Sequence, residues 1–500
     1  MRRNLRTTIF AALLALLSIT GAARAADDAV PLKIMIFNIW LGGDQVNFSR
    51  TLDAIRAADP DILLLQEPEG KTRVIADALG YAHAAERWHM VSRYPIFDPP
   101  AADADYALVE IRPGRFVAVS NIHLTSDPYG PYEARDGKTA EEVLALETET
   151  RLPEIQVYID QLGPVATSGI PVFIGGDFNA PSRLDWTEAM VGKRPALRYA
   201  LDWPVSKALA DAGFRDSYRE IHPDPAANPG ITWTTGYPVP YLLPDEAVDR
   251  IDQIHALGNS TTTASQILGE TGGPDFDIGI DPWPSDHHAV VSTFTVVPGA
   301  APAMVSFAKR SVAVGDELGV RFHAASDDGR LEDGKIAIVA SGGKAEEPLL
   351  SMGSNNSTDR ANVAYFGTVS LAPGAYDAVL TGADGKELAR APFWITAPGA
   401  VPSVTVDKTD YTAGEPITVK WQNAPGHRRD WLGIYKAGDA DQWNYLAFLY
   451  TYAAPSGETV FDEAAIGSQL DAGDYEIRLM RDDAYMTLGQ SAKFSVSAPP

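Results

Sequence analysis

The sequence contains no cysteine. Without thiols the chain can form no disulfide, no thiolate nucleophile and no cysteine-ligated zinc site, and it can carry no lipoprotein anchor on a cysteine. After the first 25 residues it also has no apolar run that approaches the ~18 residues of a membrane-spanning helix. The hydrophobic share of 45% is ordinary for a globular protein, so stability has to come from hydrophobic cores alone.

Basic residues are also scarce. The chain has 41 Lys and Arg against 66 Asp and Glu, which gives a formal net charge of −25. Such a surface repels polyanions at long range, and a dedicated nucleic-acid-binding protein usually presents a basic face instead. The composition therefore counts against that class, although a local basic groove is compatible with an acidic whole.

Residues 1–25 have the composition of a secretory signal peptide. Three arginines among the first six residues precede an apolar run, and small residues stand at Ala23 and Ala25. A charged start, an apolar middle and a small-x-small end are typical of a cleaved export signal. We expect the mature protein to begin at Ala26 and to be periplasmic or extracellular.

Two similar segments divide the rest of the chain. "PGAAP" at 298–302 and "PGAVP" at 398–402 contain only Pro, Gly, Ala and Val, without periodicity, which is typical of joints between domains. They predict three domains, which cover residues 27–297, 303–397 and 403–498.

The last two of these domains repeat one another. "VSFAKRSVAVGDELGVRF" from Val305 and "VTVDKTDYTAGEPITVKW" from Val404 match at an offset of 99, and Gly315 aligns with Gly414. Short runs of alternating apolar residues, separated by Gly, Asp and Pro turns, predict two all-β, immunoglobulin-like sandwiches. A surface or polymer ligand is a possible partner for them, which would hold an enzyme near its substrate.

Residues 27–297 alternate instead between strands and helices. A helix is expected at 47–58, and another is expected to open with a capping box formed by Thr139 and Glu142. The strands with the clearest apolar patterns are 32–40, 61–67, 116–124, 171–179, 248–257 and the run that begins at His287. Fully apolar strands need cover on both faces, which predicts a layered α/β fold.

Polar side chains lie where these strands end or begin. They are Asn38, Glu67, His123, Asp177, Asp252, Asp286 and His287. The first four close apolar runs, Asp252 interrupts "RIDQI", and the last two stand at the mouth of the final strand. Side chains alternate along a strand, so each shares a face with the core residues before it. If these strand ends converge, they form one pocket lined by carboxylates, imidazoles and amides.

That mixture of groups suits metal-assisted attack of water on a phosphate ester. Glu67 and Asp286 are hard oxygen donors of the kind that bind Mg²⁺, Mn²⁺ or Ca²⁺. Two imidazoles beside a phosphate can neutralise an oxyanion and transfer a proton. Asp252 could orient His287, as carboxylates do in many hydrolytic sites.

The motifs that carry these residues follow a known order. "FNIW", "LLLQE", "SRYPI", "NIHL", "GGDFN", "ITW", "RID" and "SDHHAV" succeed one another as they do in the endonuclease/exonuclease/phosphatase superfamily, which the chain resembles over about residues 30–297. Each motif alone could be a turn, a strand end or an ion pair, whereas eight in order are specific. The resemblance implies a four-layer α/β sandwich, with two central β-sheets flanked by helices, and a divalent-metal-dependent phosphoesterase that uses Mg²⁺, with Mn²⁺ or Ca²⁺ as alternatives.

The resemblance also implies where the metal binds. Glu67 of "LLLQE" would be the main metal ligand, and Asn38 of "FNIW" would lie beside it. Asp286 of "SDHHAV" would complete the metal site or the histidine network.

The remaining motif residues would act on the phosphate and on water. His123 would stabilise the phosphoryl oxygens or assist the leaving group, and Asp177 with Asn179 would orient or deprotonate the attacking water. Asp252 would support His287, which would act as acid, base or electrostatic clamp. Asp177 and His287 are both candidates for the general base.

The loop after His123 is the candidate for substrate contacts. It contains Tyr129, Tyr132 and Arg135, and it leaves the predicted site directly. Its aromatic rings could stack on a base or pack on a lipid or an inositol ring. The alternative is a packed surface loop without a ligand.

Three functions are compatible with the sequence. The first is an exported phosphodiesterase or phosphatase that acts on lipid head groups or small organic phosphates, and the second is a secreted nuclease. The third is a surface-binding or adhesion protein with a vestigial enzyme domain. The acidic composition favours the first over the second.

Overall fold

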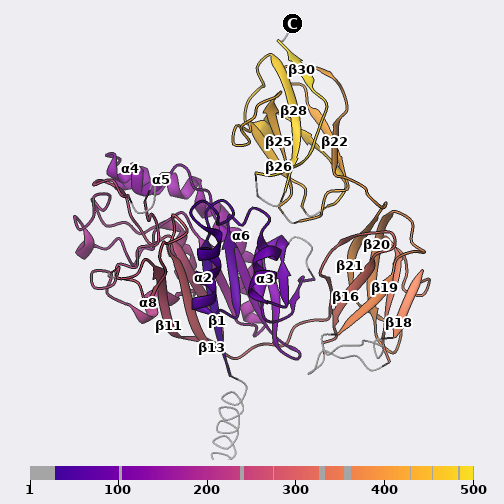
Figure 1. Ribbon diagram of the computed structural model, residues 1–500, viewed down its shortest axis with the longest axis horizontal. Helices are drawn as coiled ribbons and strands as arrows, with labels where there is room; N and C mark the ends of the chain where they lie inside the picture. Colours follow the sequence, from indigo (N-terminus) through magenta and orange to yellow (C-terminus); the bar gives the residue numbers. More distant parts are fainter. Residues whose placement is uncertain are drawn as a thin grey trace, which may run out of the picture.

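The computed structural model describes residues 29–100, 104–236, 241–273, 275–325, 333–353, 362–427, 429–452, 454–481 and 485–498. The predicted signal peptide lies outside these ranges. Figure 1 shows a layered α/β block at the beginning of the chain, followed by two all-β parts. Within the described residues, none of the helices combines the length and the apolar character that a membrane span requires.

The first sheet of the α/β block places β1 at its centre. Its seven strands run in the order β12 (Ile278–Gly279), β11 (Ser260–Gly269), β13 (Ala289–Val296), β1 (Val30–Asn38), β2 (Ile62–Gln66), β4 (Met90–Ser92) and β3 (His83–Ala85). Strand β1 is parallel to β2 and antiparallel to β13. The carboxyl ends of β1 and β2 therefore lie at the same edge as the amino end of β13.

The second sheet places three further strand termini together. Its order is β5 (Ile96–Phe97), β6 (Ala107–Arg112), β7 (Arg115–His123), β8 (Val172–Asp177), β10 (Asp252–Leu257) and β9 (Arg215–Asp216). Strands β7 and β8 are parallel, while β8 and β10 are antiparallel, so His123 lies beside Asp177 and Asp177 lies opposite Asp252. Asp252 thus stands at the amino end of β10, four residues after the expected start of that strand.

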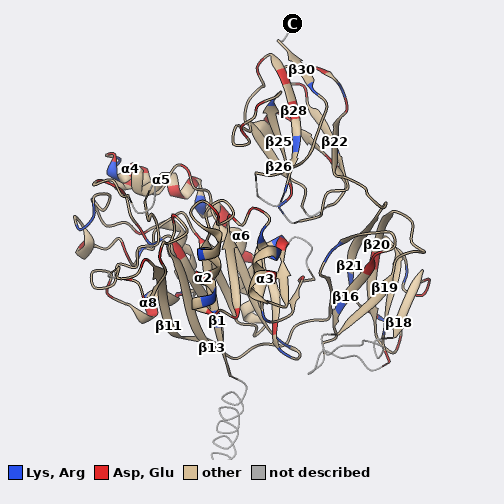
Figure 2. Ribbon diagram, viewed as in Figure 1, with Lys and Arg blue, Asp and Glu red and all other residues tan. Residues whose placement is uncertain are grey.

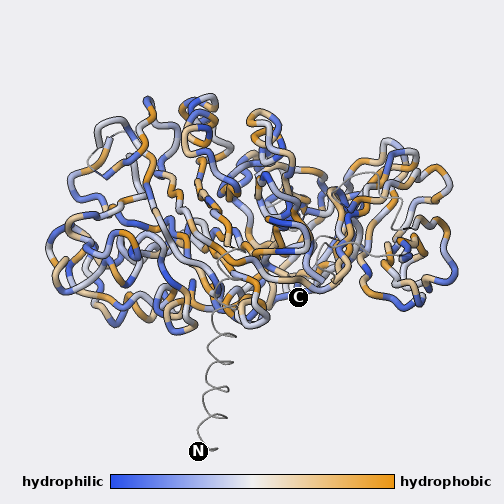
Figure 3. The backbone as a smooth tube through the Cα atoms, turned by 90° about the horizontal axis from the view of Figure 1, so that it is seen from below, coloured by the Kyte–Doolittle hydropathy of each residue, from blue (hydrophilic) through white to orange (hydrophobic). Residues whose placement is uncertain are grey.

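The two sheets pack face to face over the main core. Leu32, Ile34 and Ile36 of β1 point into this core, whereas Met35 and Phe37 point to the opposite face. The facing sheet contributes a matching set, which includes Val117, Val119, Phe173 and Ile254. Figure 3 shows hydrophobic segments running through the interior of the layered part. Asn38 has the parity of Ile36, so it emerges between the two sheets.

Helices cover the outer faces and complete four layers. Helices α2 (Phe48–Ala58) and α3 (Thr72–Leu79) pack on the first sheet, and α6 (Arg151–Thr167) and α7 (Pro204–Asp211) pack on the second. The short elements are α4 (Gly130–Arg135), α5 (Ala140–Glu149), α8 (Ser217–Ile221), η1 (Glu86–Trp88) and η2 (Glu188–Met190). The expected capping box of Thr139 and Glu142 begins α5. The predicted four-layer α/β architecture is confirmed.

The first C-terminal unit, β14 to β21, consists of two sheets around one core. One sheet is β14 (Met304–Phe307), β16 (Glu317–His323) and β19 (Val363–Gly367). The other is β15 (Ser311–Ala313), β21 (Glu387–Thr396), β20 (Gly374–Thr381), β17 (Lys335–Ala340) and β18 (Leu350–Gly353). Arg310 fixes this unit to the α/β block through two hydrogen bonds to Asp98 Oδ2, at 2.9 and 2.6 Å.

The second C-terminal unit, β22 to β30, repeats this arrangement. One sheet is β22 (Ser403–Val406), β24 (Ile417–Gln422) and β27 (Gly457–Phe461). The other is β23 (Asp410–Thr412), β30 (Phe494–Ser497), β28 (Gly473–Met480), β25 (Trp431–Lys436) and β26 (Ala447–Tyr450), with β29 (Thr487–Gln490) beside β28 and α9 (Glu463–Ile466) after β27.

The two C-terminal units share small structural details as well as strands. Tyr376 and Tyr475 each donate a 2.7 Å hydrogen bond to the carbonyl four residues before, and Gly315 and Gly414 both have positive φ angles, of 97° and 82°. The repeat seen in the sequence is therefore a repeat of structure. In Figure 2, Lys and Arg are interspersed with Asp and Glu over the α/β block and both units.

Candidate active site

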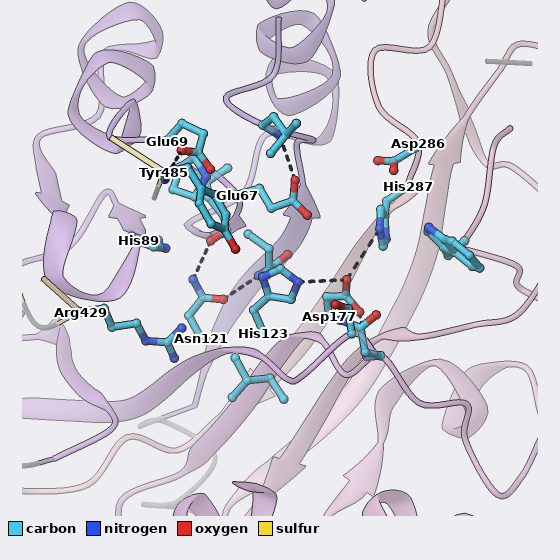
Figure 4. Close-up of a pocket in the computed structure, with 18 of the residues that line it drawn as sticks. Glu67, Glu69, His89, Asn121, His123, Asp177, Asp286, His287, Arg429 and Tyr485 are labelled. Atoms are coloured by element: carbon cyan, nitrogen blue, oxygen red, sulfur yellow. Dashed lines mark hydrogen bonds and ion pairs between the residues drawn. The ribbon is translucent and has the colours of Figure 1, made fainter. Parts of the chain in front are cut away.

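A cavity of about 400 Å³ lies at the edge where the two sheets bring their strand termini together. The predicted site residues that line it are Glu67, His123, Asp177, Asn179, Asp286, His287, Tyr129 and Tyr132. Figure 4 shows Asp286 and His287 on one side, His89 and Arg429 on the other, and Glu67 and His123 between them. Asn38 and Asp252 are buried behind the wall, with 0% and 1% exposure. The strand termini named from the sequence thus converge on one place.

Glu67 directly follows β2 and is held by the end of the neighbouring strand. Its backbone has a φ angle of 55°, and its Oε2 accepts a 2.9 Å hydrogen bond from the N–H of Leu41. Asn38 Nδ2 donates to Glu67 Oε1 and to Asp177 Oδ2, at 3.2 Å each. Asn38 therefore links carboxylates from the two sheets.

Asp177 ends β8 and lies between two imidazoles. Its Oδ2 is 3.6 Å from His123 Nε2 and 3.7 Å from His287 Nε2. Its Oδ1 accepts a 2.8 Å hydrogen bond from the backbone N–H of Asn179, whose side chain in turn donates to the carbonyl of Leu124. This turn fixes the carboxylate so that one oxygen faces both histidines.

Asp252 and His287 form a buried pair behind Asp177. His287 Nδ1 is 3.0 Å from Asp252 Oδ2, and both side chains are at most 6% exposed. Burial alone would lower the pKa of His287, but the carboxylates of Asp252, Asp177 and Asp286 outweigh it and raise that pKa. Burial raises the pKa of Asp252, against the opposing effect of His287. The environment therefore favours the imidazolium form of His287.

Asp286 is positioned by a loop that precedes β13. The N–H of Thr235 donates to the carbonyl of Asp286 at 2.9 Å, and the Thr235 hydroxyl donates to the carbonyl of Ser285 at 2.8 Å. Ser285 Oγ also donates to the carbonyl of Asn38 at 2.7 Å. These contacts join the loop to the end of β1 and leave Asp286 4% exposed in the cavity wall.

Two groups of side chains have the chemistry of a metal site. Among the described residues, the ligand atoms of Asp177, Asp252 and His287 lie within 4.8 Å of one another. Glu67 and Asp286 also line the cavity, but they do not belong to this compact group. The donors are mostly carboxylate oxygens, which fit a hard divalent cation better than a soft one.

The residues expected to contact substrate divide into two sets. Tyr129 and Tyr132 line the cavity, and their rings pack edge to face on Trp233 with centroids 5.2 and 5.8 Å away. Tyr129 is 6% exposed, and no protein group among the described residues bonds to its hydroxyl. Arg135 does not line the cavity, because its guanidinium lies over the Tyr132 ring and pairs with Asp136.

Several lining residues were not expected from the sequence. Trp233 and His89 both line the cavity. Arg429, Trp443 and Tyr485 reach it from the second C-terminal unit. None of these three lies in a recognisable motif, and their approach depends on how separate parts of the chain pack, so the sequence carried no signal for them.

The family assignment rests on a match over more than half of the chain. The model of the Endonuclease/Exonuclease/phosphatase family matches residues 35–306, which include every cavity residue named above except those of the second C-terminal unit. An uncharacterized protein of Caenorhabditis elegans is 30% identical over 298 residues, which cover 53% of this chain and 92% of that protein.

Solved structures give more distant similarities. An endonuclease/exonuclease/phosphatase from Beutenbergia cavernae is 18% identical, with a TM-score of 0.34, and the match covers 73% of this chain and 99% of that one. An AP endonuclease from Archaeoglobus fulgidus is also 18% identical, with a TM-score of 0.31, over 52% of this chain and 98% of that one.

Proposed function

This chain belongs to the Endonuclease/Exonuclease/phosphatase family and is a metal-dependent phosphoester hydrolase, and on that premise we propose that its substrate is a lipid head group or a small organic phosphate. The observation that carries this proposal is the size and enclosure of the cavity. At about 400 Å³ it lies within the range of small-molecule sites, and the second C-terminal unit supplies part of its wall.

The enclosure counts against a nucleic-acid duplex as substrate. A duplex requires an open, basic surface along its backbone, because phosphate contacts supply most of its affinity. Here Arg429, Trp443 and Tyr485 of the second C-terminal unit form part of the cavity lining, and the chain has a net charge of −25. A secreted nuclease is therefore the alternative that the experiment below has to exclude.

The metal would be held by Glu67, Asn38 and Asp286, with Mg²⁺ as the expected ion and Mn²⁺ or Ca²⁺ as alternatives. Glu67 and Asp286 present carboxylates to the cavity, whereas the Asp252–His287 pair is already engaged internally. Asn38 lies beside Glu67, with its side-chain nitrogen donating to Glu67 Oε1 and its oxygen accepting from the N–H of Trp40. A bound divalent ion would supply a Lewis acid that polarises the phosphate and neutralises its charge.

The chain's own residues would then position the phosphate and the attacking water. His123 and His287 flank Asp177, at 3.6 and 3.7 Å, so a phosphoryl oxygen between them would meet two cationic or hydrogen-bonding groups. Asp252 would orient His287 through their 3.0 Å contact. Asn179 would fix Asp177, whose second oxygen its backbone N–H already holds.

The structure supports Asp177 rather than His287 as the general base. His287 lies between carboxylates that favour its protonated form, and an imidazolium cannot accept a proton. Asp177 lines the cavity, and its Oδ2, which faces both histidines, can accept the proton of a water bound beside it. In this proposal His287 acts as electrostatic clamp and acid.

We further propose that the enzyme is exported and that its two C-terminal units are immunoglobulin-like. The arginine-led apolar start of residues 1–25 supports export. Paired sheets around one core, and a tyrosine that bonds back to the chain in each unit, support the second assignment.

The test is hydrolysis of a panel by the full chain and by Glu67→Ala, with Mg²⁺, Mn²⁺, Ca²⁺ or EDTA. The panel contains plasmid DNA, RNA, sphingomyelin, phosphatidylinositol phosphates, bis-p-nitrophenyl phosphate and p-nitrophenyl phosphate. We expect metal-dependent cleavage of the lipid or small esters, and loss of about a hundredfold or more in Glu67→Ala. Preferential cleavage of DNA or RNA would replace our proposal with the nuclease, and equal cleavage by the variant would refute the site.

A further inference from the structure

We propose that the second C-terminal unit forms part of the substrate site, where Trp443 and Tyr485 stack on a ring in the alcohol part of the phosphate ester. The inference rests on the proposed function and narrows its substrate class. The preferred esters would carry a ring with hydroxyl or phosphate oxygens, either a nucleoside or a cyclic polyol.

The two aromatic side chains form one platform at the cavity. The ring of Trp443 stacks on that of Tyr485, with centroids 3.7 Å apart and planes inclined by 26°. Both residues line the cavity, yet Trp443 is 54% exposed. A large aromatic ring that is stacked on one side and half exposed leaves surface for a ring-bearing partner. A base would stack through its π-face, and a cyclic polyol would pack through the C–H groups of one face of its ring.

This platform is anchored beside the candidate metal site. The backbone N–H of Tyr485 donates a 3.2 Å hydrogen bond to Glu69 Oε2. Glu69 lies two residues after Glu67, in the same loop, and Figure 4 shows Tyr485 next to Glu69 and Glu67. A phosphate at Glu67 would therefore leave its alcohol part within reach of the aromatic pair.

Guanidinium groups complete the same cavity. Arg429 Nη2 donates to the hydroxyl of Tyr158 at 3.1 Å, which holds the arginine against α6. Arg87 also lines the cavity, and its guanidinium is 3.4 Å from the carboxylate of Asp98. Cations near a stacking surface suit a ring that carries oxygens or a second phosphate. A simple acyclic alcohol such as glycerol carries oxygens but has no ring to stack on the aromatic pair.

The experiment compares esters that differ in their alcohol part. We would measure kcat and KM for a nucleoside monophosphate, an inositol monophosphate and glycerol phosphate, with the native chain, Trp443→Ala and Trp443→Phe. Tyr452→Ala is the matched control, because Tyr452 is an exposed aromatic residue of the same unit, at 82%, and does not line the cavity. Binding of the same three compounds would be followed by titration calorimetry in EDTA.

We expect Trp443→Ala to raise KM about tenfold for at least one ring-bearing ester, while glycerol phosphate is unaffected. Trp443→Phe should recover much of the loss, Tyr452→Ala should behave as native, and the more sensitive ester identifies the ring. An equal effect on all three esters, or no effect, would overturn the inference.

If the native chain hydrolyses nothing, the proposed function fails, and calorimetry still decides this inference. Weaker binding of ring-bearing phosphates to Trp443→Ala would support it, and equal binding would overturn it.

Discussion

At the scale of single residues, three side chains of the site face the same carboxylate oxygen. Asp177 Oδ2 faces His123, His287 and the amide of Asn38, so three side chains from three other strands or loops meet at one atom. Its partner oxygen is held by the backbone of Asn179. A group with so many fixed neighbours is preorganised, which is the condition for electrostatic stabilisation of a transition state.

In our proposal Asp252 positions His287 through their 3.0 Å contact, and its replacement distinguishes an acid from a base role for His287. In Asp252→Asn we expect kcat to fall by about a hundredfold or more, because the imidazole loses its orientation and the charge that favours its protonated form. Asp252 contributes to the raised pKa of His287, so the variant lowers that pKa. If protonated His287 is required, the alkaline limb of the pH profile of kcat/KM moves to lower pH.

A different pH profile of Asp252→Asn would contradict the assignment of His287 as an acid. If His287 were the general base, activity would require its neutral form, and it is the acidic limb that would move to lower pH in Asp252→Asn. If kcat falls while neither limb of the pH profile moves, Asp252 has only a packing role. Asp252→Glu, which retains the charge, should recover part of the activity in the first two cases.

The residue types at the site were predictable from the sequence, but their partners were not. The parity of Asn38 with Ile36 predicted that it shares a face with core residues, and Asn38 is indeed buried, on the side of Ile34 and Ile36. The sequence placed Asp252 within a strand, whereas it begins an antiparallel strand and so reaches Asp177 from the opposite direction. Strand direction depends on tertiary pairing, which a local apolar pattern does not contain.

At the scale of elements, a buried ionic cluster joins α8 to the second sheet. Asp216 N-caps α8 through the N–H groups of Tyr218 and Arg219, and it also accepts a 2.7 Å hydrogen bond from Arg250. Asp185 binds both Arg219 and Arg250. Two carboxylates and two guanidinium groups thus satisfy each other beneath β9 and β10.

Asp216→Asn should destabilise the α/β block by about 3 to 5 kcal/mol at neutral pH, because it leaves two buried guanidinium groups, those of Arg219 and Arg250, with the single carboxylate of Asp185. Burial alone would raise the pKa of Asp216, but Arg250 and the other neighbouring groups hold it well below its ordinary value near 3.8. A depressed pKa stabilises the fold above pH 3.8, and this stabilisation is lost as the pH falls below that value. Urea unfolding of both proteins at pH 7 and at pH 3 measures it.

The difference between native and variant should therefore be largest at pH 7 and smaller at pH 3. Asp202→Asn is the control, because Asp202 pairs with Arg183 at the exposed surface, and its loss should change stability by less than about 0.5 kcal/mol. A difference that stays constant between the two pH values would refute the linkage to Asp216.

The elements themselves were largely predictable, because their signals are local. Helix α2, at Phe48–Ala58, matches the helix expected at 47–58, and the apolar strands lie close to their expected ranges. The two-residue strands β5 and β9 had no detectable pattern, since two residues cannot show a period.

At the scale of the whole molecule, the repeat was evident from the sequence and the docking of its second copy was not. The offset of 99 relates both strands and turns of the two units. The contacts that bring the second unit to the cavity include individual polar pairs. One of them joins Arg481 to Glu86, which lie 395 positions apart in the sequence. Pairs of this kind leave no periodicity, so they can be found only in the folded chain.

Glu86 is the residue through which this docking can be tested. Its Oε2 is 3.3 Å from Arg481 Nη2 and 3.4 Å from His427 Nε2, and both partners belong to the second unit. Partly exposed pairs of this kind contribute about 0.2 to 1 kcal/mol each, so Glu86→Ala should loosen the unit without unfolding it.

We expect KM for a ring-bearing phosphate to rise about two- to tenfold and the segment at 398–402 to be cleaved faster by protease, while kcat for glycerol phosphate is unchanged. High salt should reproduce the rise in KM with the native chain, because it screens these pairs, and should add little in Glu86→Ala. Glu458→Ala is the matched control, since Glu458 forms a 3.0 Å ion pair with Lys420 within the same unit. If Glu86→Ala and Glu458→Ala gave the same KM and the same cleavage rate as the native chain, the second unit would not be held at the cavity by Glu86.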